Sequence, residues 1–151
     1  MKATHPKTDK GYDFSKKNKV SIWASKIPYA EIPDDYFAET LSKNGTRATN
    51  QWSKNYQIRF FNPEFMETNG AMAGLVDIEK AVGECSFSTS YIKPLLNKAK
   101  QKNLLKVSWV ILLFENEYSA KTSTIESDEY TTLVGSFNYD EEAENLYEIE
   151  E

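Results

Sequence analysis

An almost uninterrupted apolar run in the second half of the chain constrains the fold more than any other stretch. From Val107 to Phe114, every residue except Ser108 is apolar. A strand with one face in water would alternate polar and apolar residues, so this run indicates a central strand that is covered on both faces. Trp109 lies within the run, and we expect it in the core.

A second strand is expected at residues 19–25, "KVSIWAS". Its alternation directs Val20 and Ile22 to one face and Trp23, between two serines, to the other. The pattern alone leaves Trp23 either in the core or exposed as an aromatic anchor for a partner. Because the small serines would let a helix pack close around the ring, we favour the core.

Two late strands and several short helices complete the expected elements. "YTTLVGSFNYD", residues 130–140, reads as a strand that follows the apolar run across a polar loop, which favours a hairpin between the two. Pro33 suits the first position of a helix that carries Phe37 and Leu41 on one face, and "KNGTRA" would end that helix.

Three further helices are expected along the middle of the chain. "NQWSKN" would form a short helix capped by Thr49 or Asn50. Leu75, Ile78 and Val82 have helical spacing, and Gly83 would end that helix. The next helix contains Pro94 and should therefore begin shortly before it, at Ser88 or Ser90.

The order of these elements predicts a single α+β domain, with a small, mostly antiparallel sheet and helices packed against it. A chain of 151 residues is long enough for one such core. We expect a flexible polar arm at residues 1–18, the α+β domain at 19–140, and an acidic helix or tail at 141–151. Residues 140–151 carry seven acids and no base.

Charge and composition limit the partners and the compartment. The net charge is −5 and the isoelectric point is near 5.1, so the chain lacks the basic footprint of a nucleic-acid-binding protein. We see no apolar run of membrane-spanning length and no signal-peptide core, and the lone Cys85 fits a reducing compartment. We therefore expect a cytoplasmic protein with neither a membrane nor a nucleic-acid partner.

Catalytic and metal-binding patterns are absent from the sequence. The single histidine, His5, and the single cysteine, Cys85, are too few for a Cys/His metal site, and no glycine-rich phosphate loop is visible. We therefore expect no cofactor, no metal and no enzymatic activity. An acid/base pair remains open among six carboxylates, namely Asp34, Asp35, Glu64, Glu67, Asp77 and Glu79.

The order of several short motifs resembles the immunity protein 22 family of bacterial polymorphic toxin systems. The motifs are "VSIWAS" at 20–25, "DDYFAE" at 34–39, "NQWSKNYQI" at 50–58, "FNPEFME" at 61–67, "VILLFENEY" at 110–118 and "LVGSFNYD" at 133–140. The resemblance covers residues 19–140. It implies a small cytoplasmic protein that binds and neutralises a cognate toxin, often a nuclease, by occluding its surface.

The leading hypothesis is therefore a toxin-binding protein with an aromatic anchor inside an acidic rim. The candidate contacts are Asp34, Asp35, Tyr36 and Glu39, then Glu64 and Glu67 after the proline turn, with Trp52 and Trp23 as candidate anchors. Trp52 could instead pack its helix onto the sheet. The acidic end could also imitate a phosphate backbone.

Two other functions stay open at this point. One is a small carboxylate-dependent hydrolase, and the other is a regulatory adaptor for a bacterial partner other than a toxin. A homodimer is also possible, because aromatic-rich faces and strand edges can pair with a second copy.

Overall fold

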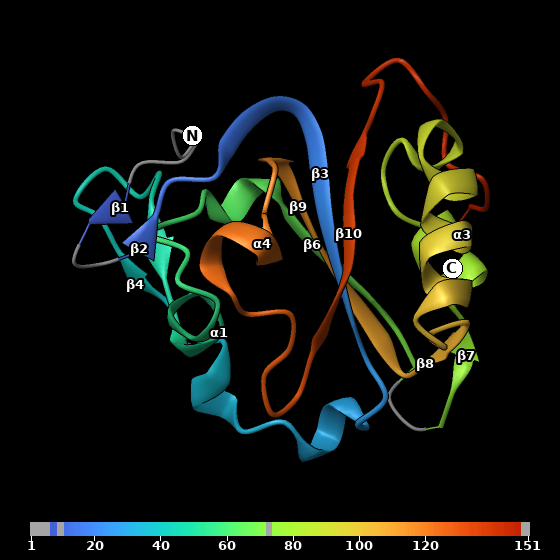
Figure 1. Cartoon of the computed structure of the whole chain (residues 1–151), viewed down its shortest axis with the longest axis horizontal. Coiled ribbons are helices and arrows are strands. Elements are labelled where there is room, and N and C mark those ends of the chain that lie inside the picture. The colour runs from blue at the N-terminus through green and yellow to red at the C-terminus, as the bar shows by residue number, and fades with distance from the viewer. Residues whose placement is uncertain (1–6, 9–10, 72–73, 149–151) are drawn as a thin grey trace.

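A four-stranded antiparallel sheet lies at the centre of the molecule (Figure 1). The computed structural model describes residues 7–8, 11–71 and 74–148. The strands follow the spatial order β10–β3–β9–β6, and each neighbouring pair is antiparallel. Their bounds are β3 (Ser15–Ser25), β6 (Met66–Gly70), β9 (Trp109–Asn116) and β10 (Thr132–Asn138). The α+β prediction is confirmed.

The apolar run forms β9, which is a central strand as predicted. It pairs with β3 on one side and with β6 on the other. Val110 and Leu112 contribute to the core on one face of the sheet, while Ile111 and Leu113 contribute to the core on the other face. The continuous apolar sequence is therefore explained by burial on both faces.

The predicted late hairpin is wrong, because β10 pairs with β3 and not with β9. Both edges of β9 are already occupied, so β10 adds at the free edge of β3. The connecting segment includes α4 (Ala120–Ser123), which lies in front of the sheet in Figure 1. This segment carries the chain past β3 to the outer edge.

Helices cover the two faces of the sheet unequally. One face packs against α2 (Ile78–Gly83), the 3-10 turn η4 (Ser88–Ser90) and α3 (Ile92–Gln101). The other face is covered by short elements, whose bounds are η1 (Tyr29–Glu31), η2 (Asp34–Tyr36), α1 (Gln51–Asn55) and η3 (Pro63–Phe65), together with α4.

Trp23 is the centre of the core under these short elements. Its side chain is 0% exposed, and its ring meets that of Trp52 edge-on at a centroid distance of 4.8 Å. The rings of Tyr56 and Tyr118 lie 5.6 and 5.3 Å away. The prediction that Trp23 is a core residue is confirmed.

The short helix α1 forms where the sequence predicted it, with Asn50 as its cap. The Asn50 side chain accepts a hydrogen bond from the Ser53 backbone N–H at 2.7 Å. In return, the Ser53 hydroxyl accepts from the Asn50 backbone N–H at 2.9 Å. This reciprocal capping fixes the start of α1 and directs Trp52 into the core.

The predicted helix over residues 34–41 is wrong. Only η2, a single 3-10 turn, forms there, and the chain then enters β4 (Thr40–Leu41). This strand pairs with β5 (Ala48–Thr49) across a turn that contains Asn44 and Gly45. Asn-Gly favours tight hairpins, so the motif read as a helix stop closes a hairpin and leaves Leu41 55% exposed.

The later helices agree better with the sequence. Helix α2 ends at Gly83 as predicted, but it begins only at Ile78, and Leu75 lies before it with 53% of its side chain exposed. Helix α3 begins at Ile92, which places Pro94 in its first turn. Two short strands flank these helices in the sequence, β7 (Val76–Asp77) before α2 and β8 (Lys106–Val107) after α3. They pair with each other in antiparallel orientation.

The N-terminal boundary differs from the expected polar arm at residues 1–18. The strand β3 begins at Ser15, and Phe14 is 1% exposed in the core beside Tyr118. The preceding pair consists of β1 (Lys7–Thr8) and β2 (Gly11–Tyr12). Residues 1–6 and 9–10 lie outside the described residues.

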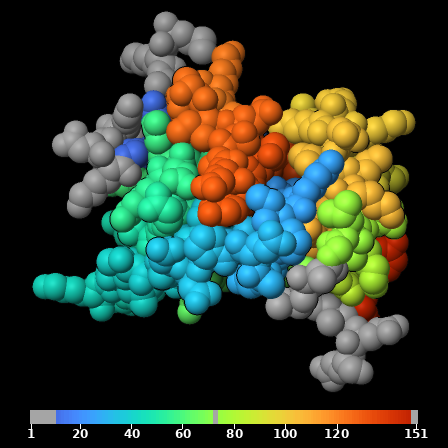
Figure 2. Space-filling model, turned by 90° about the horizontal axis from the view of Figure 1, so that it is seen from below, coloured from blue at the N-terminus to red at the C-terminus, as the bar shows by residue number. Residues whose placement is uncertain are grey.

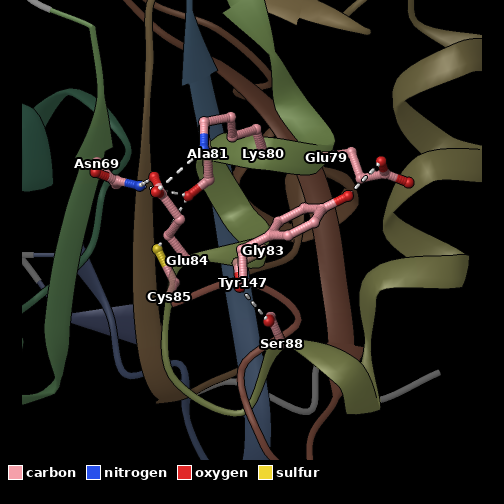
Figure 3. Close-up of polar contacts among 9 residues, drawn as sticks. All are labelled: Asn69, Glu79, Lys80, Ala81, Gly83, Glu84, Cys85, Ser88 and Tyr147. Atoms are coloured by element: carbon pink, nitrogen blue, oxygen red, sulfur yellow. Dashed lines mark hydrogen bonds and ion pairs between the residues drawn. The ribbon is translucent and has the colours of Figure 1, made fainter. Parts of the chain in front are cut away.

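The acidic C-terminal segment has no helix within residues 141–148, and it packs against α2 and η4 (Figure 3). The backbone N–H of Tyr147 donates to the Gly83 carbonyl at 2.9 Å, and that of Leu146 donates to the Ser88 hydroxyl at 2.7 Å. A Cβ at Gly83 would lie 2.6 Å from the Tyr147 ring, so the close approach requires glycine. Residues 149–151 of the expected tail lie outside the described residues.

The burial of Trp23 gives a first prediction. Trp23→Ala should lower the free energy of unfolding by about 3–5 kcal/mol, since it removes a buried ring and leaves a cavity. Leu41→Ala, at an exposed position, should change it by less than about 0.5 kcal/mol. Urea denaturation measures both, and an unchanged midpoint for Trp23→Ala would contradict the core assignment.

Candidate partner-binding surface

The 3-10 turn η2 is held at the molecular surface by buried residues on either side of its two acids. Ile32 is 8% exposed and Tyr36 is 2% exposed, and both belong to the core that surrounds Trp23. Pro33 precedes the turn in an extended conformation. Asp34 and Asp35 point away from the core and are exposed. Two adjacent carboxylates therefore lie on a short turn that is fixed by buried residues on both sides.

Asp128 connects this turn to two other segments through what we call the Asp128 network. One of its carboxylate oxygens accepts from the backbone N–H groups of Tyr130 and Thr131 at 2.9 and 2.8 Å, and from the Thr131 hydroxyl at 2.9 Å. Its other oxygen accepts from the Asn55 amide at 3.0 Å and from the Tyr36 hydroxyl. The network joins η2, α1 and the loop before β10.

Two buried tyrosines complete the support beneath this surface. Tyr56 donates its hydroxyl to the Thr131 carbonyl at 2.8 Å. Burial is the main cause that raises the pKa of both Tyr36 and Tyr56 above the ordinary value, and the hydrogen bond to Asp128 raises that of Tyr36 further. Both hydroxyls therefore stay protonated in alkaline solution where free tyrosine would ionise, and both act as hydrogen-bond donors.

We call the exposed residues Asp34, Asp35 and Glu129, together with the half-buried Tyr130, the acidic surface. Tyr130 packs edge-on against Tyr36 at 5.0 Å. Partial desolvation raises the pKa of Tyr130, and the negative charges of Glu129, Asp35 and Asp128 raise it further. Figure 2 looks onto this face, where the blue segment after β3 lies against the orange segment before β10.

The sequence indicated only the η2 half of this surface. Asp128 and Glu129 were missed because "ESDE" reads as a polar loop, and Tyr130 was missed because it was assigned to the strand that follows. One local signal was present, since an Asp that accepts the backbone N–H two residues later is a common turn former. Nothing local indicated that Asp128 would also accept a hydrogen bond from Tyr36.

The other candidate residues lie elsewhere. Glu39 is exposed farther along the segment that follows η2. Trp52 is 0% exposed and supports the surface from within the core. Glu64 on η3 and Glu67 on β6 lie at the sheet edge opposite to β10, so the structure does not bring them to the acidic surface.

Three other carboxylates considered for an acid/base pair instead make contacts that connect segments of the fold. Glu67 accepts from the Ser86 backbone N–H at 2.9 Å, Asp77 pairs with Lys106 at 2.7 Å, and Glu79 accepts from the Tyr147 hydroxyl at 3.0 Å.

Two further findings concern metals and the thiol. Within residues 7–8, 11–71 and 74–148, no three His, Cys, Asp or Glu side chains are grouped so as to hold a metal ion. Burial raises the pKa of the Cys85 thiol to about 12, which makes it a poor nucleophile at neutral pH. His5, its only possible histidine partner, lies outside the described residues.

The fold and this surface define a class of small α+β protein that presents charged loops on one face of a compact core. In the part of the chain that the structure describes, no helix has both the length and the apolar character needed to cross a membrane.

Comparison with known proteins gives the family. The family model named Immunity protein 22 matches residues 20–140, and the chain belongs to that family. No curated protein and no solved structure matches the chain significantly. Membership supports an immunity function in general, in agreement with the resemblance of the sequence motifs.

The buried tyrosine hydroxyl gives a second prediction. Free tyrosine ionises near pH 10, so above that pH the unfolded chain loses a proton that Tyr36 keeps in the folded state. The free energy of unfolding should therefore fall as the pH rises above about 10, by up to about 1.4 kcal/mol per pH unit for this group.

The Tyr36→Phe variant lacks this contribution and should show a shallower alkaline loss, measured by urea denaturation at several pH values. Tyr29→Phe, at an exposed position, is the matched control and should follow the wild type. Identical pH profiles for Tyr36→Phe and the wild type would contradict the assignment.

Proposed function

We propose that this protein binds a bacterial toxin through the acidic surface and blocks it by occlusion, without catalysis by the chain itself. The observation that carries the proposal is that the exposed carboxylates of Asp34, Asp35 and Glu129 lie beside Tyr36 and Asp128 of the Asp128 network, on which Tyr130 also packs. The exposed carboxylates provide charge, and the buried network fixes their positions. A partner would therefore meet a preorganised surface and pay little conformational entropy.

The electrostatics favour a basic partner. Exposed carboxylates of one sign attract a basic surface during diffusion and fix its orientation on contact. The half-exposed ring of Tyr130 is of the residue type that dominates binding energies at interfaces. We therefore infer that Tyr130 is the aromatic contact and that Asp34, Asp35 and Glu129 supply the charge, while Glu39, farther along the same segment, extends the proposed contact. Trp52 supports the core beneath them.

A nuclease is the toxin class that this chemistry fits. A nuclease must attract the phosphate backbone with lysine and arginine side chains, and a carboxylate surface can occupy the same basic site. We propose the bacterial cytoplasm as the compartment, where a free, buried thiol such as Cys85 remains reduced. Glu64 and Glu67, at the other sheet edge, are left out of the proposed contact.

Charge reversal on η2 gives a third prediction. Asp34→Lys/Asp35→Lys should weaken toxin binding by at least about tenfold, mainly through slower association, because two attractions become repulsions. Co-expression with the toxin encoded beside this gene measures protection, and surface plasmon resonance measures the association rate.

The matched control is Glu141→Lys/Glu142→Lys, an adjacent exposed pair outside the acidic surface with the same change in net charge. It should protect cells as well as the wild type does. Full protection by the Asp34→Lys/Asp35→Lys variant would rule out this surface, and failure of the wild type to protect would rule out toxin neutralisation.

A further inference from the structure

A groove of opposite charge lies on another part of the molecule, with a volume of about 410 Å³. Its apolar lining includes the buried side chains of Phe61, Leu113 and Phe114, and the ring of Phe65, which is 41% exposed. Its charged lining consists of three cations, Lys16, Lys17 and Arg47, and one carboxylate, Glu115. The groove therefore combines apolar surface with positive charge in a protein whose net charge is −5.

The groove forms where the regular sheet stops. The edge strand β6 begins at Met66, opposite Leu113, because the η3 turn directs the preceding chain away from the sheet. Among the described residues, no strand pairs with Phe114–Asn116 on that side. The register of β3 against β9 also shifts between Ser15 and Val20. The segment between them, which contains Lys16 and Lys17, is therefore irregular where it borders the groove.

The cations of the groove form no ion pair within the described residues. The ion pairs found there involve other lysines, Lys19, Lys80, Lys102 and Lys106. None involves Lys16, Lys17 or Arg47. Arg47 instead lies over the ring of Phe60 at 4.3 Å, and this contact holds the guanidinium at the groove without neutralising its charge.

Two carboxylates offset part of this charge, namely Glu115, which lines the groove, and Asp13, which interacts with Arg47. The Glu115 carboxylate accepts from the Asn18 backbone N–H at 2.6 Å and from the Tyr139 hydroxyl at 2.9 Å. For Asp13, burial raises the pKa, but hydrogen bonds from Ser15 and the positive charges of Arg59 and Arg47 outweigh it and lower the pKa. Asp13 therefore offsets part of the Arg47 charge, but three cations against the single lining carboxylate of Glu115 leave the groove with an excess of positive charge.

We propose that the groove binds an acidic, extended segment of a partner protein, with an aromatic or aliphatic side chain of that segment against Phe65 and carboxylates against Lys16, Lys17 and Arg47. The short stretch Phe114–Asn116, which lies beyond the end of β6 and pairs with no described strand on that side, borders the groove where such a segment would lie. This proposal does not involve the acidic surface and does not depend on the proposed toxin contact.

The number of cations favours a short acidic segment over a nucleic acid. Proteins that bind nucleic acids typically neutralise about 6–10 phosphates, whereas three cations line this groove. A long polyanion would also be repelled by the net charge of −5. A few carboxylates beside one apolar side chain match what the groove offers.

Fluorescence anisotropy of the full chain with a short labelled peptide rich in Asp and Glu, and carrying a single Phe, tests the proposal. The peptide should bind, and the same peptide with Asn and Gln in place of the acids should not. Lys16→Glu/Lys17→Glu should weaken binding by about tenfold, because two exposed ion pairs become repulsions. Salt at about 1 M should weaken it as well, since the screening length falls to about 3 Å.

The matched control is Lys93→Glu/Lys98→Glu, two exposed positions on α3 with the same change in net charge. It should bind the acidic peptide as the wild type does. The proposal is overturned if the acidic peptide does not bind, if the neutral peptide binds as well, if the α3 variant loses as much affinity, or if an oligothymidylate of equal length binds more tightly. No toxin is used, so these outcomes leave the toxin proposal untouched.

Discussion

Strand β3 lies between β9 and β10 and contributes side chains to the core on both faces of the sheet. Its alternating side chains join two separate cores, with Val20 and Ile22 under α2 and α3 on one face and Trp23 under short loops on the other. Because the second face is covered by single turns and not by long helices, many loop residues reach the surface there. The acidic surface consists of residues from those loops. Their positions are set by neighbouring residues, such as Ile32 and Tyr36, that are buried in the core around Trp23.

The strongest local signals in the sequence predicted the local structure well. The apolar run gave the central strand β9, the Asn50 cap gave α1, and the serines beside Trp23 indicated a buried ring. Two predictions failed where a nonlocal pairing decided the outcome. Asn44 and Gly45 close a β-hairpin in place of ending a helix, and β10 passes β9 to pair with β3. Neither partner strand can be inferred from the segment itself.

The acidic surface was predictable only in part, for the same reason. Asp34 and Asp35 follow a proline, and this local pattern indicates exposed acids at the start of a turn. Asp128 is 92 residues away from Tyr36 in the sequence, and only the folded sheet brings them together. Such a polar network holds its members in one geometry because an unpaired buried hydroxyl or amide would be costly. The hydrogen bonds of the Asp128 network can therefore keep the acidic surface rigid although it consists of loops.

We propose that the acidic surface is the face which contacts the toxin. Amide hydrogen exchange of the protein, measured alone and with the cognate toxin bound, tests this most directly, because protection by a partner maps onto individual segments. We predict that bound toxin slows exchange in residues 34–39 and 126–131 and leaves α3, on the opposite face of the sheet, unchanged. Slowed exchange confined to α3, or to the groove residues 15–17 and 60–65, would contradict the claim.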